Sequence, residues 1–163
     1  KNDMFRITSK YRNLKFDKVL EFFKLIPIDK MSMFAEEKLF DIKESADKKS
    51  WSAIRLRVTT APLVTDREQV SIVNIRYLDD GKVFFCARSI DDDRFPLTKN
   101  RIRCASNELY EMSETEENGE KIVTMNGCST FDLKGYIPPS LLNMATANNI
   151  FKINQTMVKV LKE

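Results

Sequence analysis

The sequence has no histidine, and only three of its 163 residues are cysteine. Without histidine, the chain cannot form a Ser-His-Asp triad or a Cys-His pair, and it lacks the commonest zinc ligand. Cys86, Cys104 and Cys128 show no CxxC spacing, which argues against a disulfide framework and fits a reducing compartment. We therefore expect no catalytic residues, no metal and no cofactor, and we predict that the protein is not an enzyme.

Long apolar runs and a strong excess of one charge are absent as well. No run approaches the roughly 20 apolar residues of a membrane span, and the first residues form no signal-peptide pattern. The net charge is +3 with both signs interspersed, which is too small to indicate nucleic acid as a partner. It does allow weak attraction to an anionic membrane. We expect a cytoplasmic monomer that contacts membrane surfaces transiently.

The hydrophobic pattern changes its period along the chain and predicts a single α+β domain over residues 1–163. The pattern predicts strands over 4–12, 37–45, 50–59, 67–78, 81–90, 101–112 and 120–133, and helices over 16–26, 28–36 and 138–161. Gly81 suits a tight hairpin turn, and residues 114–119 are expected to form a polar loop. The long last helix is expected to cover the apolar face of the antiparallel sheet.

Three motifs in the second half of the chain resemble the START (steroidogenic acute regulatory protein-related lipid transfer) family. They are the segment from Thr65 to Val70, the segment from Cys86 to Ile90 followed by Pro96 and residues 101–103, and the segment from Asp132 to Pro138. The chain departs from the family pattern at two positions. Glu68 stands where the family has aspartate, and Gln69 stands where the family has an aromatic residue. The family's N-terminal helix and first strands are also expected to be missing before Met4.

The resemblance implies a helix-grip fold, in which a curved antiparallel sheet of about six to seven strands wraps a long C-terminal helix and encloses a lipid cavity. It implies that the chain binds one lipid in an internal tunnel and transfers it between membranes or senses it. Alternatives are a regulatory START module within a larger protein, a domain with a filled interior, and a cyclase-like helix-grip enzyme. The lack of histidine argues against the enzyme, although Tyr136 and Glu68 stay open as acid–base residues.

Strand alternation predicts which side chains would line such a cavity. The expected ligand-binding residues are Ile54, Leu56, Arg67, Gln69, Ser71, Val73, Phe85, Ala87, Met125, Ser129 and Phe131 on the strands, and Leu142, Ala145, Asn149 and Ile153 on the last helix. The set assumes that Ile54, Leu56 and Val58 face inward. Asn149 is expected either to hydrogen-bond a head group or to mark a kink.

Arg67 is the sharpest candidate, because a guanidinium matches a phosphate bidentately and the resemblance places this arginine near a phosphate. The alternative is a structural ion pair with Asp66 or Glu111. Sterol-binding relatives resemble one another in an internal acid–arginine pair, where this chain has Ile54 and Val73, so phospholipid is favoured over sterol or ceramide. The apolar loop with Pro62, Leu63 and Val64 is expected to act as a gate or membrane-contacting loop, or to pack against the last helix.

Overall fold

The computed structural model describes residues 4–31, 33–61, 64–137 and 155–162. Within these ranges the elements follow one another as β1 (Met4–Arg12), α1 (Phe16–Lys24), η1 (Ile28–Lys30), β2 (Phe34–Glu44), β3 (Ser50–Ala61), β4 (Val64–Tyr77), β5 (Val83–Ser89), β6 (Ile102–Arg103), β7 (Ala105–Glu117) and β8 (Glu120–Asp132). Residues 155–162 are helical. None of the described helices is long and apolar enough to cross a membrane.

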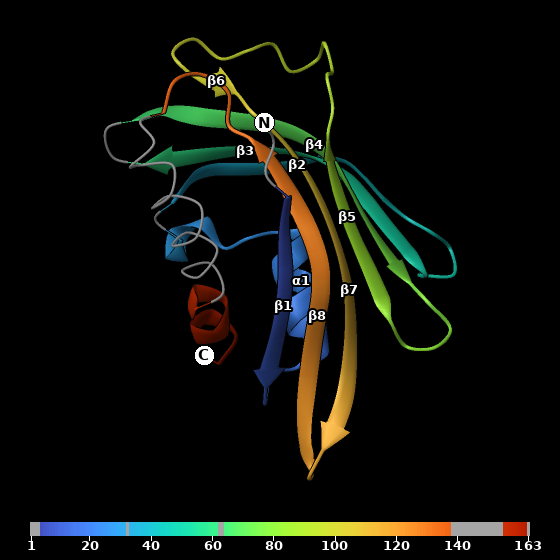
Figure 1. Ribbon diagram of the computed structural model, residues 1–163. Helices are drawn as coiled ribbons and strands as arrows, with labels where there is room; N and C mark the ends of the chain where they lie inside the picture. Colours follow the sequence, from blue (N-terminus) through green and yellow to red (C-terminus); the bar gives the residue numbers. More distant parts are fainter. Residues whose placement is uncertain (1–3, 32, 62–63, 138–154, 163) are drawn as a thin grey trace.

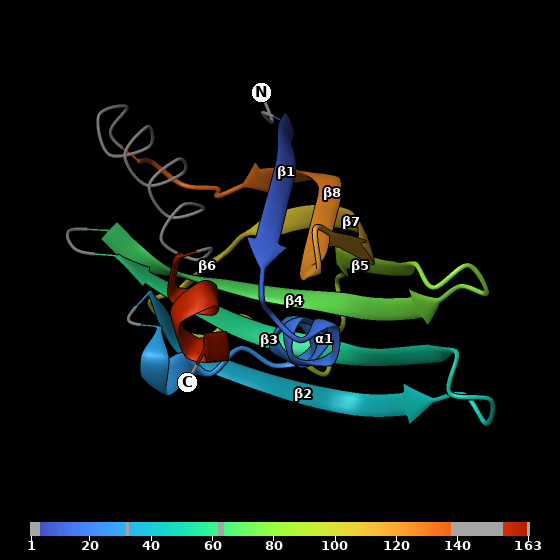
Figure 2. The same cartoon turned by 90° about the horizontal axis from the view of Figure 1, so that it is seen from below.

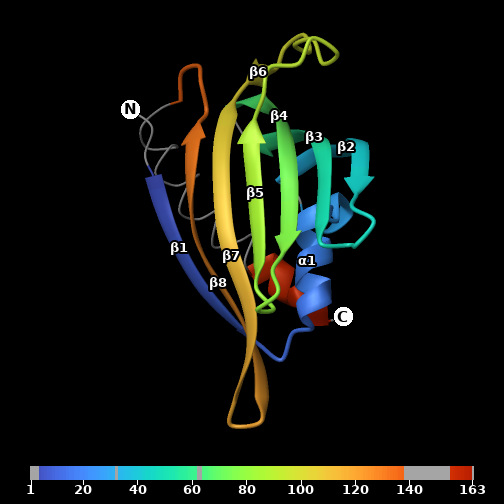
Figure 3. The ribbon, with the colours of Figure 1, turned by 90° about the vertical axis from the view of Figure 1, so that its right-hand side faces the viewer.

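The strands form one strongly curved sheet in the order β1-β8-β7-β5-β4-β3-β2, with neighbouring strands antiparallel. The short strand β6 pairs in parallel with β4 beside this path. Figures 1 and 2 show α1 and the helical residues 155–162 on the concave side of the sheet. Figure 3 shows the convex side, with the connection from β5 to β6 at its upper edge. The predicted fold class, a curved antiparallel sheet around a C-terminal helix, is confirmed.

The hydrophobic core fills part of the concave side. In α1 the residues Val19, Leu20 and Phe22 are buried, and the neighbouring strands bury Val73 and Ile75 against them. Removing such side chains from water stabilises the fold by about 1.5–3 kcal/mol each. The sequence predicted a helix at 16–26 but not where this helix packs. In the structure, α1 covers the concave face of the sheet, as the helical residues 155–162 do.

Two predicted elements differ from the structure. The helix expected over 28–36 is only the single turn η1, and β2 begins at Phe34, because Phe34 and Glu37 are drawn into the interior as strand residues. The polar loop expected over 114–119 is a continuous hairpin in which Glu117 pairs with Glu120. Its two turn residues, Asn118 and Gly119, have φ values of 54° and 78°, and an Asn-Gly pair with positive φ closes a two-residue hairpin without a longer loop.

Candidate functional site

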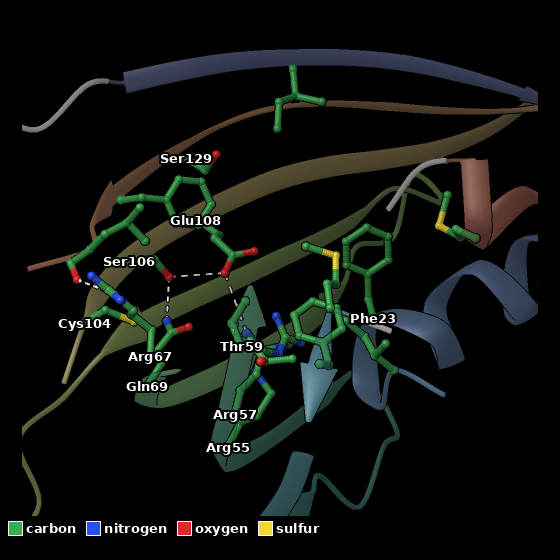
Figure 4. Close-up of a pocket in the computed structure, with 18 of the residues that line it drawn as sticks. Phe23, Arg55, Arg57, Thr59, Arg67, Gln69, Cys104, Ser106, Glu108 and Ser129 are labelled. Carbon is green, nitrogen blue, oxygen red and sulfur yellow. Dashed lines mark hydrogen bonds and ion pairs between the residues drawn. The ribbon is translucent and has the colours of Figure 1, made fainter. Parts of the chain in front are cut away.

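A cavity of about 240 Å³ lies between the concave face of the sheet, α1 and the helical residues 155–162. Figure 4 shows side chains from several strands converging on it. This volume lies just below the range of about 300–1,000 Å³ that is usual for small-molecule sites. Its apolar lining consists of Ile7, Phe22, Phe23, Ile26, Met33, Phe34, Val64, Phe85, Met125, Phe131, Leu133, Ile137 and Met157.

An aromatic cluster separates the cavity from the filled core. The ring of Phe23 from α1 lies 5.1 Å from the ring of Phe85 and 5.9 Å from that of Tyr110, measured between centroids. Phe85 and Tyr110 stack at 5.8 Å. Burial raises the pKa of the Tyr110 hydroxyl, so this residue stays neutral. The three rings form an aromatic wall of the cavity.

Four charged residues lie together beside the cavity, and we call them the charged cluster: the buried residues Glu37, Arg55 and Arg57, and the half-buried Glu108. The Nη2 atom of Arg57 donates to Oε1 of Glu37 at 3.0 Å. Arg55 lies between the two acids, with Nε 3.9 Å from Glu37 and Nη2 3.7 Å from Glu108. Its side chain is only 2% exposed, and that of Glu37 is fully buried. Arg55, Arg57 and Glu108 line the cavity, and Figure 4 shows the two arginines side by side.

The charged cluster leaves hydrogen-bonding capacity unused. Among the described residues, no hydrogen-bond partner is found for Oε2 of Glu37, for Nε and Nη2 of Arg55, or for Nε of Arg57. Burial lowers the pKa of Arg55 to about 10, with nearby Arg57 as a second cause, so the guanidinium remains charged at neutral pH. Buried charges without complete hydrogen bonding are costly for stability. A cluster of this kind is suited to a ligand whose polar group supplies the missing partners.

Uncharged polar groups extend the charged cluster across the sheet. Gln69 donates through Nε2 to the hydroxyls of Ser89, at 3.2 Å, and Ser106. The hydroxyl of Ser106 in turn donates to Oε1 of Glu108 at 3.3 Å, as Figure 4 shows. Cys104 lies nearby in the wall, and burial raises the pKa of its thiol to about 11. A polar band thus crosses an otherwise apolar cavity.

Arg67 lines the cavity but is engaged by the backbone. Its guanidinium donates to the carbonyl oxygens of Leu133 and Lys134, both at 3.3 Å, and to that of Thr65. Within the described residues it forms no ion pair, so the alternative of a salt bridge with Asp66 or Glu111 is wrong. Phosphate binding by Arg67 stays a prediction. The contacts give it another task, which is to fasten the segment after β8 to the start of β4.

The predicted direction of the β3 side chains is wrong. Arg55 and Arg57 line the cavity, whereas Ile54 and Leu56 alternate with them and lie on the convex side, as does Val58, which pairs with Glu68. Ala61 pairs with Val64, and if this register continued along the two strands, Leu56 would lie opposite Gln69. A bulge between Thr59 and Ala61 shifts the register by one residue. Arg57 therefore pairs with Gln69 instead. The bulge therefore inverts the faces expected for the strand.

One apolar residue in the sequence of β3 does indicate its inward face. Trp51, the single tryptophan, alternates in step with Arg55 and Arg57 and is buried. The largest apolar side chain of the strand thus indicates the inner face. Glu37 and Glu108, the acidic half of the charged cluster, carried no comparable signal in the sequence.

The other predicted residues divide into three groups. The structure brings Arg67, Gln69, Phe85, Met125, Ser129, Phe131 and Val64 together at the cavity wall. Ser71, Val73 and Ala87 lie on the same face of the sheet but are fully buried outside the lining. Leu142, Ala145, Asn149, Ile153, Pro62 and Leu63 lie outside the described residues. The part of each in ligand binding stays a prediction.

The two residues left open for acid–base chemistry do not meet. Tyr136 is 82% exposed, whereas Glu68 is buried on the convex side of β4 against Thr98, Arg101 and Arg103. Burial alone would raise the pKa of Glu68, but hydrogen bonds from Thr98 and Arg103 outweigh it and hold the pKa below its usual value. Among the described residues, no group of three or more acids and cysteines is placed to hold a metal ion.

Comparison with known proteins decides the family. The sequence model of the START domain matches residues 56–163. The chain belongs to the START domain family. Membership supports lipid binding or transfer as its general function. Among curated proteins, no sequence matches the chain significantly.

Solved structures of START-type domains share the fold at low sequence identity. Human STARD10 superposes with a TM-score of 0.73 at 13% identity, covering 94% of this chain and 62% of that one. A STAR-related lipid transfer protein from Xanthomonas axonopodis gives 0.72 at 16% identity, covering 96% and 85%. Human StAR-related lipid transfer protein 5 gives 0.68 at 12% identity, covering 99% and 86%. This START domain thus spans less than two thirds of the STARD10 chain.

Proposed function

We propose that this START domain carries one phospholipid in its cavity, with the head group against the charged cluster and the acyl chains along the apolar lining. The observation that carries the proposal is the set of unpartnered donors and acceptors on Glu37, Arg55 and Arg57 beside an apolar cavity. The solved relatives from Xanthomonas axonopodis and human are named lipid transfer proteins, which agrees with a carrier rather than an enzyme.

The balance of charges favours a phospholipid. A phosphate can accept hydrogen bonds from the planar donors of Arg55 and Arg57, and a cationic amine can lie against Glu108. A sterol hydroxyl, or the hydroxyl and amide groups of a ceramide, carry no charge, so they would form weaker hydrogen bonds with the unpartnered groups of the cluster than a phosphate does. A head group with both signs matches a cluster that itself contains two acids and two bases.

The size of the cavity implies that loading is accompanied by widening. A diacyl phospholipid is larger than 240 Å³, so the walls must separate before the lipid is fully enclosed. Val64 and Ile137 both line the cavity. Tyr136, next to Ile137, is 82% exposed, and tyrosine favours the membrane–water interface. We place the membrane contact at this side of the cavity.

A second candidate is a sensing module that holds its lipid without moving it. The same cavity serves both roles, and they differ in the rate at which lipid leaves. A carrier releases its lipid to acceptor membranes within minutes, whereas a sensor retains it.

Transfer of fluorescent phosphatidylcholine from donor to acceptor vesicles tests the proposal. The wild-type chain should accelerate transfer, and Arg55→Met should reduce the rate at least about tenfold, equivalent to one charge-assisted hydrogen bond with the phosphate. Arg88→Met is the matched control, because Arg88 is exposed on the convex side of β5, and it should transfer at the wild-type rate. Wild-type protein that does not accelerate transfer, or Arg55→Met that transfers normally, would contradict the carrier.

A further inference from the structure

Arg67 and Glu68 are neighbours in β4 whose side chains leave the sheet on opposite faces, and both are buried. On the concave side, Arg67 holds residues 133–137, which we call the mouth segment, through the carbonyls of Leu133 and Lys134. Leu133 and Ile137 of the mouth segment line the cavity. The position of this segment therefore helps to set how open the cavity is.

On the convex side, Glu68 holds residues 95–103, which we call the strap. Its carboxylate accepts hydrogen bonds from the hydroxyl of Thr98, from Nη2 of Arg103 at 2.9 Å and from Nη1 of Arg101 at 3.4 Å. The same Nη2 of Arg103 donates to the carbonyl of Phe95 at 2.7 Å. The buried carboxylate of Glu68 thus binds the strap at three residues, and Arg103 links it to Phe95 at the other end of the strap.

The strap and the mouth segment also contact each other directly. Ile102 pairs with Arg67 through β6, and Arg103 pairs with Glu68. A Cβ atom placed on Gly135 would lie 2.8 Å from Cδ1 of Ile102 and 3.7 Å from Nη2 of Arg67. Gly135, at a φ of +66°, therefore lies against the terminal methyl of Ile102, and a side chain at this position would have to displace that methyl and adopt a strained backbone conformation.

We propose that the strap and the mouth segment form one cooperative unit, clamped through β4 by Arg67 and Glu68, so that a change at the convex surface alters access to the cavity. The physical basis is a contiguous path from Thr98 to Glu68, from Glu68 to Arg103 and its chain neighbour Ile102, and from Ile102 to Gly135. The consequence for lipid exchange rests on the proposed function. The mechanical coupling does not, and it can be measured on lipid-free protein.

Amide NMR relaxation dispersion on lipid-free protein tests the coupling. Thr98→Val removes one hydrogen bond to Glu68 on the strap, far along the contact path from Gly135. The chain has four glycines, so the Gly135 amide is readily resolved. We expect residues 95–103, Gly135 and Ile137 to exchange at one common rate, with a displaced population roughly tenfold larger than in wild type. Gly81 and Gly119, in the two hairpin turns, should keep wild-type relaxation.

The controls separate coupling from local loosening. Thr115→Val, at an exposed position of the β7–β8 hairpin, should change nothing at Gly135. Arg67→Lys, which keeps the charge but loses the planar donors, should bring the same exchange to residues 95–103 from the other side. If Thr98→Val affects only residues 95–103 and leaves Gly135 and Ile137 unchanged, the two clamps are independent and the proposal is wrong. A wild-type chain that transfers no lipid would overturn the proposed function while leaving this result intact.

Discussion

The charged cluster makes a quantitative prediction about stability. The side chain of Glu37 is fully buried and pairs with two arginines. Its Oε1 accepts a hydrogen bond from Nη2 of Arg57 at 3.0 Å and lies 3.9 Å from Nε of Arg55. Glu37→Gln leaves these two cations facing each other, with Glu108 as the one remaining acid paired with either of them among the described residues. Removing one partner of a buried ion pair costs about 3–5 kcal/mol, which is a large part of the total stability of an ordinary domain.

Arg55→Met should cost much less, although Arg55 is equally buried. The change removes a guanidinium whose Nε and Nη2 have no hydrogen-bond partner among the described residues. The pair between Arg57 and Glu37 stays, and Ser106 still donates to Glu108. We expect a loss below about 2 kcal/mol, since no buried group loses its main partner.

Urea unfolding measures both values on lipid-free protein. With a slope of about 2 kcal/mol/M, Glu37→Gln should lower the midpoint by roughly 2 M and Arg55→Met by less than about 1 M. Glu111→Gln is the control, because Glu111 is a partly exposed acid 3.5 Å from Lys82 and should cost under about 1 kcal/mol. If Arg55→Met lowers the free energy of unfolding as much as Glu37→Gln does, at an unchanged dependence on urea concentration, then Arg55 is as necessary to the cluster as Glu37 and the prediction is wrong.

Two further predictions concern backbone packing and acid stability. Gly127→Ala places a Cβ 2.0 Å from the carbonyl oxygen of Leu109 and should destabilise the fold by about 1–3 kcal/mol in urea unfolding, whereas Asn126→Ala, at the exposed neighbouring position, should be nearly neutral; equal effects would contradict the clash. Glu68 has a lowered pKa, so its charge stabilises the folded state above the ordinary value of 4.5, and this contribution is lost as the pH falls through the lower folded value. Glu68→Gln should therefore be less stable than wild type at pH 7 and should converge with it in acid; a constant difference down to pH 2 would show that the carboxylate charge is not the cause.

Alternation and turn chemistry predicted much of the sheet. The inward side chains of β4, β5 and β8 were predicted correctly, because each strand has one set of alternate positions that fits a buried face. The helix at residues 16–26 followed from its apolar spacing. The Asn118-Gly119 pair is typical of a tight hairpin turn, but the acidic residues on either side of it favour a polar loop, which is why the exposed hairpin was not predicted.

The charged cluster could not be predicted from the alternation of apolar and polar residues. Alternation assigns apolar residues to the interior, so Ile54 and Leu56 were preferred over Arg55 and Arg57. The bulge between Thr59 and Ala61 decides the register, and it depends on pairing with β4 rather than on local sequence. The approach of Glu37 depends in turn on the pairing of β2 with β3, which has two register shifts of its own.

Native mass spectrometry after exposure to mixed vesicles shows which lipid the cavity binds. The vesicles would contain phosphatidylcholine, phosphatidylethanolamine, cholesterol and ceramide in equal amounts, and the wild-type chain would be reisolated and sprayed under non-denaturing conditions. The account predicts one phospholipid per chain, because only a head group with both charges satisfies the charged cluster around Arg55. Recovery of chain without lipid, or of chain carrying only cholesterol or ceramide, would contradict it.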